Sequence, residues 1–429
     1  MPSSILYQNA QRTVFLVDIP SSIANAQHLP TSPCPGTQRR LISSPPLEQP
    51  FPSPPEPKRD KARENVLKMI PESQRQLHES IRLIIERGLQ EIRDSLSVGS
   101  RWCLPRECTS TIHDDVGKGA EENEAPRSNK TRNQGKVQTT IFCLSPRPPV
   151  ILSPTDTNRF SSLADLHGTE VRNPSPNSVS IRVAADSQTF TIPPASSFVL
   201  GTLSTPTASA NTPPIPGLPP DRKYSLIILD PPWPNRSARR AAQYKTHAEK
   251  GNSLNGLVAL LRDIIHTHLD TTSLANPPRV AIWTTNSAKS CQAAHKVFQD
   301  TGIVPVEEWI WLKTTVSGEP VTPLDGLWRK PYEILIIGQA AATATSGMVG
   351  AESSSTRVNR RLLVAVPDVH SRKPNLGELV KAVGFFSSGD PGTGQKYAAL
   401  EVFARNLTAG WTACGDDVLR FNSDRWWIL

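Results

Sequence analysis

The sequence predicts an α/β protein whose core is a doubly wound, mostly parallel β-sheet, with a helical and irregular N-terminal region before it. Two observations support this fold class. From residue 223 onward, short apolar runs of strand type alternate with longer runs of helix type, as in parallel sheets that are covered by helices. The first of these runs, Tyr224–Leu229, is apolar along most of its length, which is typical of a strand buried on both faces.

The region before this domain is rich in proline and is expected to be largely irregular. The chain has 41 prolines, well above the usual share of about 5%, and they cluster in three stretches that are poor in large apolar residues. Such stretches bury too little apolar surface to offset the entropy of ordering the chain. The predicted organisation is a disordered proline-rich tail (1–59), a helix region with a polar linker (60–150), strands leading into the main sheet (151–204), a proline-rich linker (205–222) and a main domain (223–429) with a disordered insertion (340–361).

One amphipathic helix is predicted after Pro71, a residue suited to a helix start. Its apolar positions recur every three or four residues, at Leu77, Ile81, Ile84, Ile85, Leu89, Ile92 and Leu96. The opposite side carries Arg75, Arg82, Arg87 and Arg93. These arginines are either the solvated face of a packed helix or a basic brace for the phosphates of a nucleic acid. Two alternating segments, 178–183 and 189–192, follow as predicted strands.

The elements of the main domain follow from periodicity and from capping residues. Residues 280–283, 308–313 and 333–338 predict strands, and residues 288–300 and 376–383 predict helices. Gly302 lies just past the first helix, where a left-handed cap is usual. A last strand is predicted at 400–404.

Composition limits the functional class. The six cysteines are scattered without a paired spacing, which fits a reducing compartment. Cys103, Cys108 and His113 have a loose spacing and lack a fourth ligand, so no metal site is expected. No apolar run reaches the roughly 18 residues that span a bilayer, and no signal peptide is expected. A net charge of +8 suits a polyanionic partner.

The tetrapeptide Asp230-Pro231-Pro232-Trp233 directly follows the first strand of the main domain. The prolines end the strand because they cannot donate to its ladder. The tetrapeptide therefore lies where open α/β sheets bind ligands. An aromatic amine such as N6 of adenine is a poor nucleophile. A carboxylate and a backbone carbonyl would accept hydrogen bonds from its two N–H groups and stabilise the positive charge that develops on the nitrogen. Trp233 would stack on the base. The alternative is an ordinary Asp-Pro turn with an interface tryptophan.

The chain resembles the adenine-N6 methyltransferases that carry this DPPW motif, and most closely the branch called methyltransferase-like protein four. The resemblance covers roughly the C-terminal half. It rests on ordered matches at 192–198, 224–233, 283–286, 309–313, 317–319, 323–325, 330–333, 370–374, 400–406, 410–412 and 415.

The resemblance implies the fold of S-adenosylmethionine-dependent methyltransferases, which is Rossmann-like, and makes 223–429 the catalytic domain. It assigns cofactor contacts to Asp230, Pro231, Lys373, Arg405, Asn406 and Asp416, with Lys373 meeting the methionine carboxylate. At Asp416-Asp417 this sequence departs from the family, which usually has Asn followed by Gln or Glu. The expected catalytic residues are Asp230, Pro231, Pro232 and Trp233.

The residues expected on the substrate side come from neighbouring segments. Asn235, Ser237 and Tyr244 follow the tetrapeptide, and Trp283 and Asn286 lie at the end of the next strand. By resemblance, the substrate side also includes Lys313, Lys330 and Glu333. Lys330 and Glu333 would equally form a structural ion pair. Trp233 completes the set as the stacking residue.

Two functional hypotheses follow from the sequence. The first is an S-adenosylmethionine-dependent methyltransferase acting on adenine N6, by resemblance on 2′-O-methyladenosine of small nuclear RNA in the nucleus, with DNA adenine as the alternative substrate. The second is a catalytically silent RNA-binding scaffold subunit. Silent partners in the family lose the acid or the aromatic residue of the tetrapeptide, whereas Asp230 and Trp233 are both present here. The predicted helix after Pro71 and the long N-terminal region favour a self-sufficient monomer, with a heterodimer, as formed by the paired mRNA methyltransferase of the wider family, as the alternative.

Overall fold

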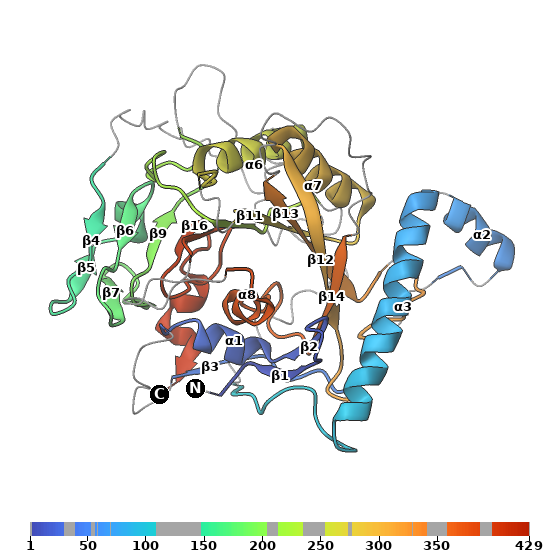
Figure 1. Ribbon diagram of the computed structural model, residues 1–429. Helices are drawn as coiled ribbons and strands as arrows, with labels where there is room; N and C mark the ends of the chain where they lie inside the picture. Colours follow the sequence, from blue (N-terminus) through green and yellow to red (C-terminus); the bar gives the residue numbers. More distant parts are fainter. Residues whose placement is uncertain are drawn as a thin grey trace, which may run out of the picture.

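A twelve-stranded β-sheet forms the centre of the molecule in the computed structural model (Figure 1). The structure describes residues 2–29, 39–52, 56–57, 59–68, 70–108, 147–203, 213–234, 254–272, 277–327, 329–340, 358–386 and 397–428. The strand order is β1-β2-β14-β12-β13-β11-β10-β15-β16-β9-β6-β4. The predicted doubly wound, mostly parallel α/β fold is confirmed.

The central strands fix the direction of the sheet. β10 (Leu226–Leu229) runs parallel to both of its neighbours, β11 (Arg279–Thr284) and β15 (Ala399–Val402). β16 (Thr412–Gly415) and β9 (Ser197–Leu200) continue in parallel on one side. On the other side β13 (Tyr332–Ala340) is antiparallel to both β11 and β12 (Ile303–Lys313), and β14 (Asn359–Ala365) is parallel to β12. The ends of β10, β11, β12, β14 and β15 and the start of β13 therefore meet at one edge.

Helices cover both faces of this sheet. The apolar sides of α3 (Glu72–Ser95), α6 (Leu254–His268) and α7 (Ala288–Thr301) belong to the core on one face. The core on the other face includes α1 (Ile19–Asn25), α8 (Gly377–Val383) and the aromatic residues near the C-terminus. Gly302 caps α7 at φ 67°, as its position predicts. Figure 1 shows α6 and α7 on one side of the sheet and α1 and α8 on the other.

Part of the N-terminal region belongs to the main sheet, so the prediction of a disordered tail over 1–59 is wrong for the residues of this range that the structure describes. β1 (Ile5–Gln8) pairs with β2 (Val14–Val17), and β2 pairs in parallel with β14. β3 (Arg40–Leu41) pairs with the C-terminal β17 (Trp427–Ile428). All four residues of β2 are buried. Their apolar surface outweighs the proline-rich composition of the segment as a whole.

The segment 151–204 joins the main sheet only in part. β4 (Val150–Ile151), β6 (Glu170–Arg172) and β9 extend it, whereas β5 (Asn158–Phe160), β7 (Val179–Val183) and β8 (Thr189–Ile192) form a separate three-stranded sheet. The strands predicted at 178–183 and 189–192 are present as β7 and β8, but they belong to this separate sheet and only precede β9 of the main sheet along the chain. Alternating burial along β7 shows that these strands pack one face inward, into a core that they share with β6, β9 and β16 of the main sheet.

Three further boundaries differ from the predictions. Ile215 and Leu218 are buried, so the described part of the predicted linker 205–222 belongs to the core. The predicted insertion 340–361 includes the end of β13 and the start of β14, and residues 341–357 lie outside the described part. The strand at 399–402 is followed by β16, so it is not the last. Most of the polar linker in 60–150 also lies outside the described residues.

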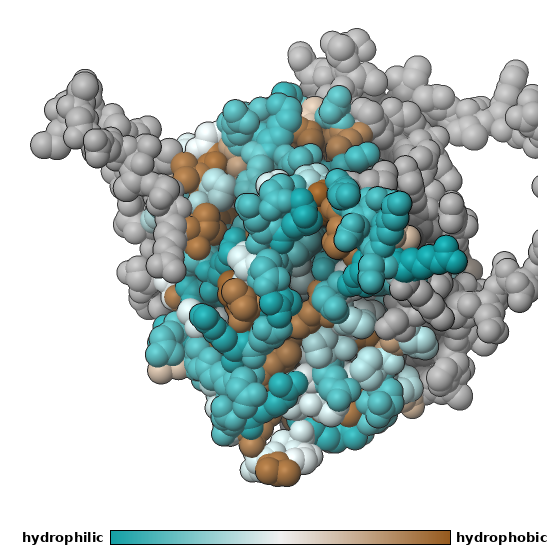
Figure 2. All heavy atoms as spheres, turned by 90° about the vertical axis from the view of Figure 1, so that its right-hand side faces the viewer, coloured by the Kyte–Doolittle hydropathy of each residue, from teal (hydrophilic) through white to brown (hydrophobic). Residues whose placement is uncertain are grey.

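The predicted helix is α3, and it packs against the sheet through Ile81, Ile85, Leu89 and Ile92. A short helix, α2 (Asp60–Lys68), precedes it and buries none of its residues. On the outer side of α3, Arg82 pairs with Glu79 and Glu86 and Arg75 pairs with Glu72, whereas Arg93 donates to the backbone carbonyl of Gly318. These contacts favour a solvated, ion-paired face over a phosphate brace. Figure 2 shows this side of the molecule as mainly hydrophilic with scattered hydrophobic patches.

Among the described residues, no helix has the length and apolar character needed to cross a membrane.

Candidate active site

The site is built where β10 ends. β10 is bonded to β11 and β15 along its full length, which fixes the direction of the chain that leaves it. The amide of Asp230 still donates to the carbonyl of Val402 at 3.2 Å, so the first residue of the tetrapeptide is anchored to the sheet. Pro231 is buried, and its carbonyl accepts the amide N–H of Trp233 at 2.8 Å. The tetrapeptide is a tight turn held on a rigid strand.

Two lysines and two carboxylates alternate in a row along this edge. Nζ of Lys373 lies 2.8 and 2.9 Å from the two carboxylate oxygens of Asp230 and 3.5 Å from Oε2 of Glu333. Nζ of Lys313 lies 2.6 Å from Oε1 of the same Glu333. The row thus links the ends of β12 and β10, the start of β13 and the loop before α8. Because neighbouring charges are opposite, each one stabilises the next.

The pKa values of the row reflect this arrangement. Burial alone would raise the pKa of Glu333, but the charges of Lys313 and Lys373 outweigh it and lower the pKa to about 2. Burial would lower the pKa of Lys373, but Asp230 and Glu333 outweigh it and raise the pKa. Both groups therefore stay charged at neutral pH. Glu333 pairs with Lys313 and Lys373, and not with Lys330 as the structural alternative proposed.

A third carboxyl group lies beside the row. Glu401 is opposite Ile228 in the β10–β15 register, and its side chain lines the same cavity as Asp230. Burial, with a smaller contribution from the charge of Asp230, raises its pKa to about 8. Glu401 is therefore neutral at pH 7, and it offers one donor and one acceptor to a ligand.

The two tryptophans predicted for the site are fixed by direct contacts. Nε1 of half-buried Trp233 donates to the backbone carbonyl of Trp283 at 2.7 Å. Trp283 is buried, and Nζ of Lys373 lies 5.4 Å from the centroid of its ring. The cation contributes to holding that ring. The orientation of Trp233 thus depends on the strand next to its own.

A cavity at this edge collects most of the predicted cofactor residues. Its lining includes Asp230, Trp283, Lys373, Glu401, Arg405 and Asn406, with Trp411 and Phe421 as aromatic walls. Arg405 donates to the carbonyl of Ser371 at 3.1 Å, which connects the segment after β15 to the loop that carries Lys373. Among the described residues, none accepts a hydrogen bond from the buried Nδ2 of Asn406. Such an atom suits a polar ligand.

Other predicted site residues lie elsewhere or outside the described part. Asp416 is exposed and does not line the cavity, and its neighbour Asp417 pairs with Arg420. Nζ of Lys330 donates to the carbonyl of Leu324, and its charge acts on His78 of α3. Asn286 lies near Lys330 and donates weakly to its carbonyl at 3.4 Å. Asn235, Ser237 and Tyr244 lie outside the described residues, as does His113 of the rejected metal group.

Sequence reasoning missed Glu401 and Arg372. An acid within the apolar run Ala399–Val402 is a detectable signal, because a carboxyl group in a buried strand costs free energy unless it has a role. Arg372 precedes Lys373 and would be taken for a surface residue, yet its side chain is 1% exposed. Only the fold shows that it faces the interior.

The arrangement can hold a cationic or amino-bearing ligand against Asp230. Acceptors from Asp230 and Glu401, donors from Lys373, Arg405 and Asn406, and the aromatic rings match a zwitterionic ligand with a heteroaromatic part. Asp230 is the residue of the tetrapeptide that lines this cavity.

Comparison with known proteins agrees with this geometry. The MT-A70 family model matches residues 224–417. A protein of Pyricularia oryzae named N6-methyladenosine RNA methyltransferase MTA1 is 31% identical, over 100% of this chain and 97% of its own length. The MTA1 protein of Cryphonectria parasitica is 30% identical, over 99% of this chain and 94% of its own length. The N(6)-adenine-specific methyltransferase METTL4 of Homo sapiens is 31% identical, over 54% of this chain and 44% of its own length.

Proposed function

The chain belongs to the MT-A70 family of adenine-N6 methyltransferases, and from this premise we propose that it methylates adenine N6 in RNA with S-adenosylmethionine as the methyl donor. The observation that carries the proposal is the Asp230 turn, held between β11 and β15 beside Lys373 and Glu401. The catalytic acid and aromatic residue of the DPPW motif are both present and anchored. A silent scaffold would not need this ionic row.

Asp230 is the residue that acts on the target amine. Lys373 takes one lone pair from each carboxylate oxygen of Asp230, and further lone pairs remain to accept N–H bonds from N6. These bonds direct the nitrogen lone pair away from the ring and oppose the positive charge that develops on it. Lys373 also fixes the carboxylate, so little reorganisation is needed. The carbonyl of Pro231 is partly used by Trp233 and keeps one lone pair.

The residues around the cavity fit S-adenosylmethionine. When bound, this cofactor supplies an electrophilic methyl group on a sulfonium sulfur. Lys373 and Arg405 would face its carboxylate, and Asn406 and Glu401 its ribose and neighbouring polar atoms. The unpartnered Nδ2 of Asn406 and the neutral carboxyl group of Glu401 are suited to uncharged polar groups. The exposed position of Asp416 gives it no place in this set.

Relatives that align along their whole length support RNA as the polymer. Both named MTA1 proteins carry RNA in their names, and they cover more than nine-tenths of this chain and of themselves. Within RNA, we propose 2′-O-methyladenosine of small nuclear RNA as the target, from the resemblance to the methyltransferase-like protein four branch. That substrate would place the enzyme in the nucleus. The N-terminal strands complete the enzyme's own sheet, which supports a monomer.

A substrate panel tests this proposal. Purified protein and labelled S-adenosylmethionine would be offered matched oligonucleotides that contain adenosine, 2′-O-methyladenosine or deoxyadenosine. We expect the fastest transfer to the 2′-O-methyl RNA. Faster transfer to plain adenosine would retain RNA and reject the small nuclear RNA target. Preference for the deoxy strand would replace RNA with DNA as the polymer, and no transfer to any of them would favour the scaffold hypothesis.

A further inference from the structure

The loop that carries Lys373 is held in an unusual backbone conformation. This loop, called here the lysine loop (residues 366–375), connects β14 to α8. Ser371 has φ +64°, a left-handed conformation that residues with a side chain keep only when their surroundings enforce it. The next two side chains then diverge: Arg372 enters the interior and Lys373 reaches Asp230.

Inside the protein, Arg372 and Asp368 lock the two halves of the lysine loop together. Nη1 of Arg372 donates to Oδ2 of Asp368 at 2.6 Å and to the carbonyl of Ile42 at 3.0 Å. The guanidinium group also lies 4.1 Å from the ring centroid of Phe421. Asp368 in turn accepts the amide N–H of Ser44 at 2.9 Å. Both members of the pair are buried, at 1% and 0% exposure.

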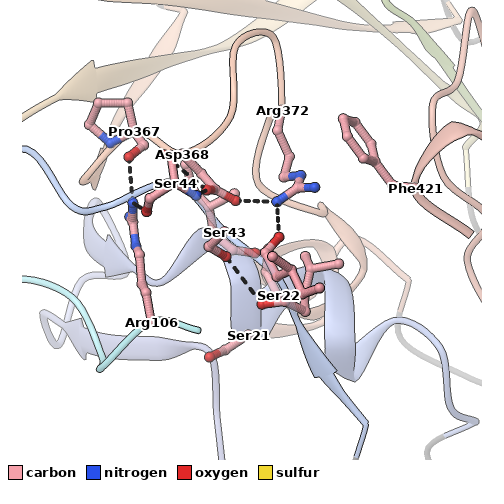
Figure 3. A network of polar contacts seen from close by, with 12 residues as sticks. Ser21, Ser22, Ser43, Ser44, Arg106, Pro367, Asp368, Arg372 and Phe421 are labelled. Carbon is pink, nitrogen blue, oxygen red and sulfur yellow. Dashed lines mark hydrogen bonds and ion pairs between the residues drawn. The ribbon is translucent and has the colours of Figure 1, made fainter. Parts of the chain in front are cut away.

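A second arginine holds the lysine loop from the outside. Nη2 of Arg106 donates to the carbonyl of Val366, and Nη1 donates to the carbonyl of Pro367, both at 2.8 Å. Nη1 also reaches the carbonyl of Ser44 at 3.3 Å. Figure 3 shows Arg106 and Arg372 approaching the loop from opposite sides, with Asp368 and Ser44 between them. These bonds are made to the backbone of the loop itself, so they fix its path.

Four residues that hold this loop come from segments that precede the matched domain 224–417. Arg106, Ser44 and Ile42 are three of them, and Ser22 of α1 is a fourth, because its hydroxyl accepts the amide N–H of Asn375 at 2.9 Å. The N-terminal region therefore touches the loop two residues from Lys373. A domain defined by the family match alone lacks these contacts.

We propose that Arg106 is a positioning residue of the methyl-transfer site, which acts through Lys373, and that Arg372, which also lines the cavity, holds the same loop from the inside. They fix the lysine loop so that Lys373 stays between Asp230 and Glu333, and they make the N-terminal region part of the cofactor-binding apparatus. This inference rests on the proposed function, since it concerns cofactor affinity. Without Arg106 the loop samples other paths, and holding Lys373 in place then costs conformational entropy.

A double-mutant cycle tests the inference. Binding of S-adenosylhomocysteine to the full-length chain would be measured by calorimetry for the wild type, Arg106→Ala, Lys373→Ala and the double variant. We expect Arg106→Ala to raise Kd about tenfold. In the Lys373→Ala background the same change should alter Kd by no more than about twofold, because residues that act through one group are not additive. With saturating cofactor, the kcat of Arg106→Ala should stay close to the wild-type value while KM for S-adenosylmethionine rises.

Controls separate positioning from general stability. Arg101→Ala removes an exposed arginine from the same segment, paired with Glu48, and should leave Kd unchanged. Arg106→Lys keeps the charge with fewer donors and serves if Arg106→Ala does not fold. Arg372→Lys should give the same selective rise in Kd.

Several results would overturn the inference. They are an unchanged Kd in Arg106→Ala or Arg106→Lys, additive effects with Lys373→Ala, or a loss of kcat without a change in KM. If the wild type did not bind S-adenosylhomocysteine at all, the proposed function itself would fail, and the inference would fall with it. The two kinds of failure are therefore distinguishable.

Discussion

At the scale of single residues, the site is organised by Lys373. Its ammonium group contacts both oxygens of Asp230 and lies near Glu333. The sequence predicted that Asp230 and Lys373 belong to one site, because the tetrapeptide and the later Lys-Pro element both resemble family motifs. It did not predict that the two side chains would pair with each other. That pairing depends on the left-handed backbone conformation of Ser371. A glycine at this position would have indicated such a conformation, but a serine does not.

Glu401 gives the site a predictable pH dependence. Its folded-state pKa of about 8 lies above the usual value near 4.3 for an unfolded chain. Between those two values the folded protein keeps a proton that the unfolded chain releases, so this group makes the free energy of unfolding fall as pH rises from about 4.3 to 8. We expect Glu401→Gln to remove this contribution and to raise the thermal midpoint at pH 8 more than at pH 5.

Thermal unfolding at a series of pH values, followed by circular dichroism, would check this. Glu64→Gln, on the exposed surface of α2, is the matched control and should leave the pH profile unchanged. Parallel profiles for the wild type and Glu401→Gln would show that the carboxyl group is already ionised at neutral pH.

At the scale of elements, strong apolar periodicity is sufficient to predict a helix or strand from the sequence, and weak periodicity is not. α3 and α7 matched their predictions because repeated apolar positions and a capping glycine are local features. Composition does not predict β1 and β2, because each is only four residues long and lies in a segment that is rich in proline overall. β2 pairs with β14, which lies more than 340 positions later in the chain, and β1 joins the sheet through β2. Such a contact leaves no local signal.

Gly318 supports the segment that leads from α3 to Arg106. It has φ +80°, and a Cβ atom there would lie 2.4 Å from the ring of Trp102. Trp102 is buried, and its amide donates to the carbonyl of Val316. We expect Gly318→Ala to lower the free energy of unfolding by roughly 2–4 kcal/mol, from backbone strain together with overpacking.

Gly384 provides a matched control for this prediction. It has φ +73° with no heavy atom within 4 Å of the added Cβ, so Gly384→Ala should cost only the backbone strain of about 1–2 kcal/mol. Urea unfolding of both variants would give the difference. Equal costs would mean that Trp102 moves away freely and does not brace the segment.

At the scale of the whole molecule, the N-terminal residues complete the sheet and the core on both of its faces. Phe15 and Leu16 are both 0% exposed, on opposite faces of β2. Composition predicts the opposite, because the prolines of the first 59 residues outweigh two strands of only four residues each. The central strands and the Asp230 turn could be predicted from local sequence. The part of the sheet and core that the N-terminal region forms could not be predicted in this way, because it depends on long-range strand pairing.

Leu16→Ala tests how much the N-terminal strands contribute to the free energy of unfolding. Removal of a fully buried leucine side chain should cost about 2–5 kcal/mol, whereas Leu83→Ala on α3, where the residue is 44% exposed, should change stability by about 0.5 kcal/mol or less. Urea unfolding of the full-length chain would measure both. Equal, small effects would show that the N-terminal strands contribute little to the folded core.

The central claim is that Asp230 directs the chemistry of methyl transfer to adenine N6. The most direct measurement compares wild type and Asp230→Asn in a transfer assay with labelled S-adenosylmethionine and an adenosine-containing RNA, with the modified nucleoside identified by mass spectrometry and cofactor binding measured alongside. We predict N6-methylated adenosine from the wild type, and at least a hundredfold slower transfer by Asp230→Asn (about 10²–10³ for the loss of one charge-stabilising group) with cofactor binding retained. Near-normal transfer by Asp230→Asn, or a methyl group at another atom of the nucleoside, would contradict the account.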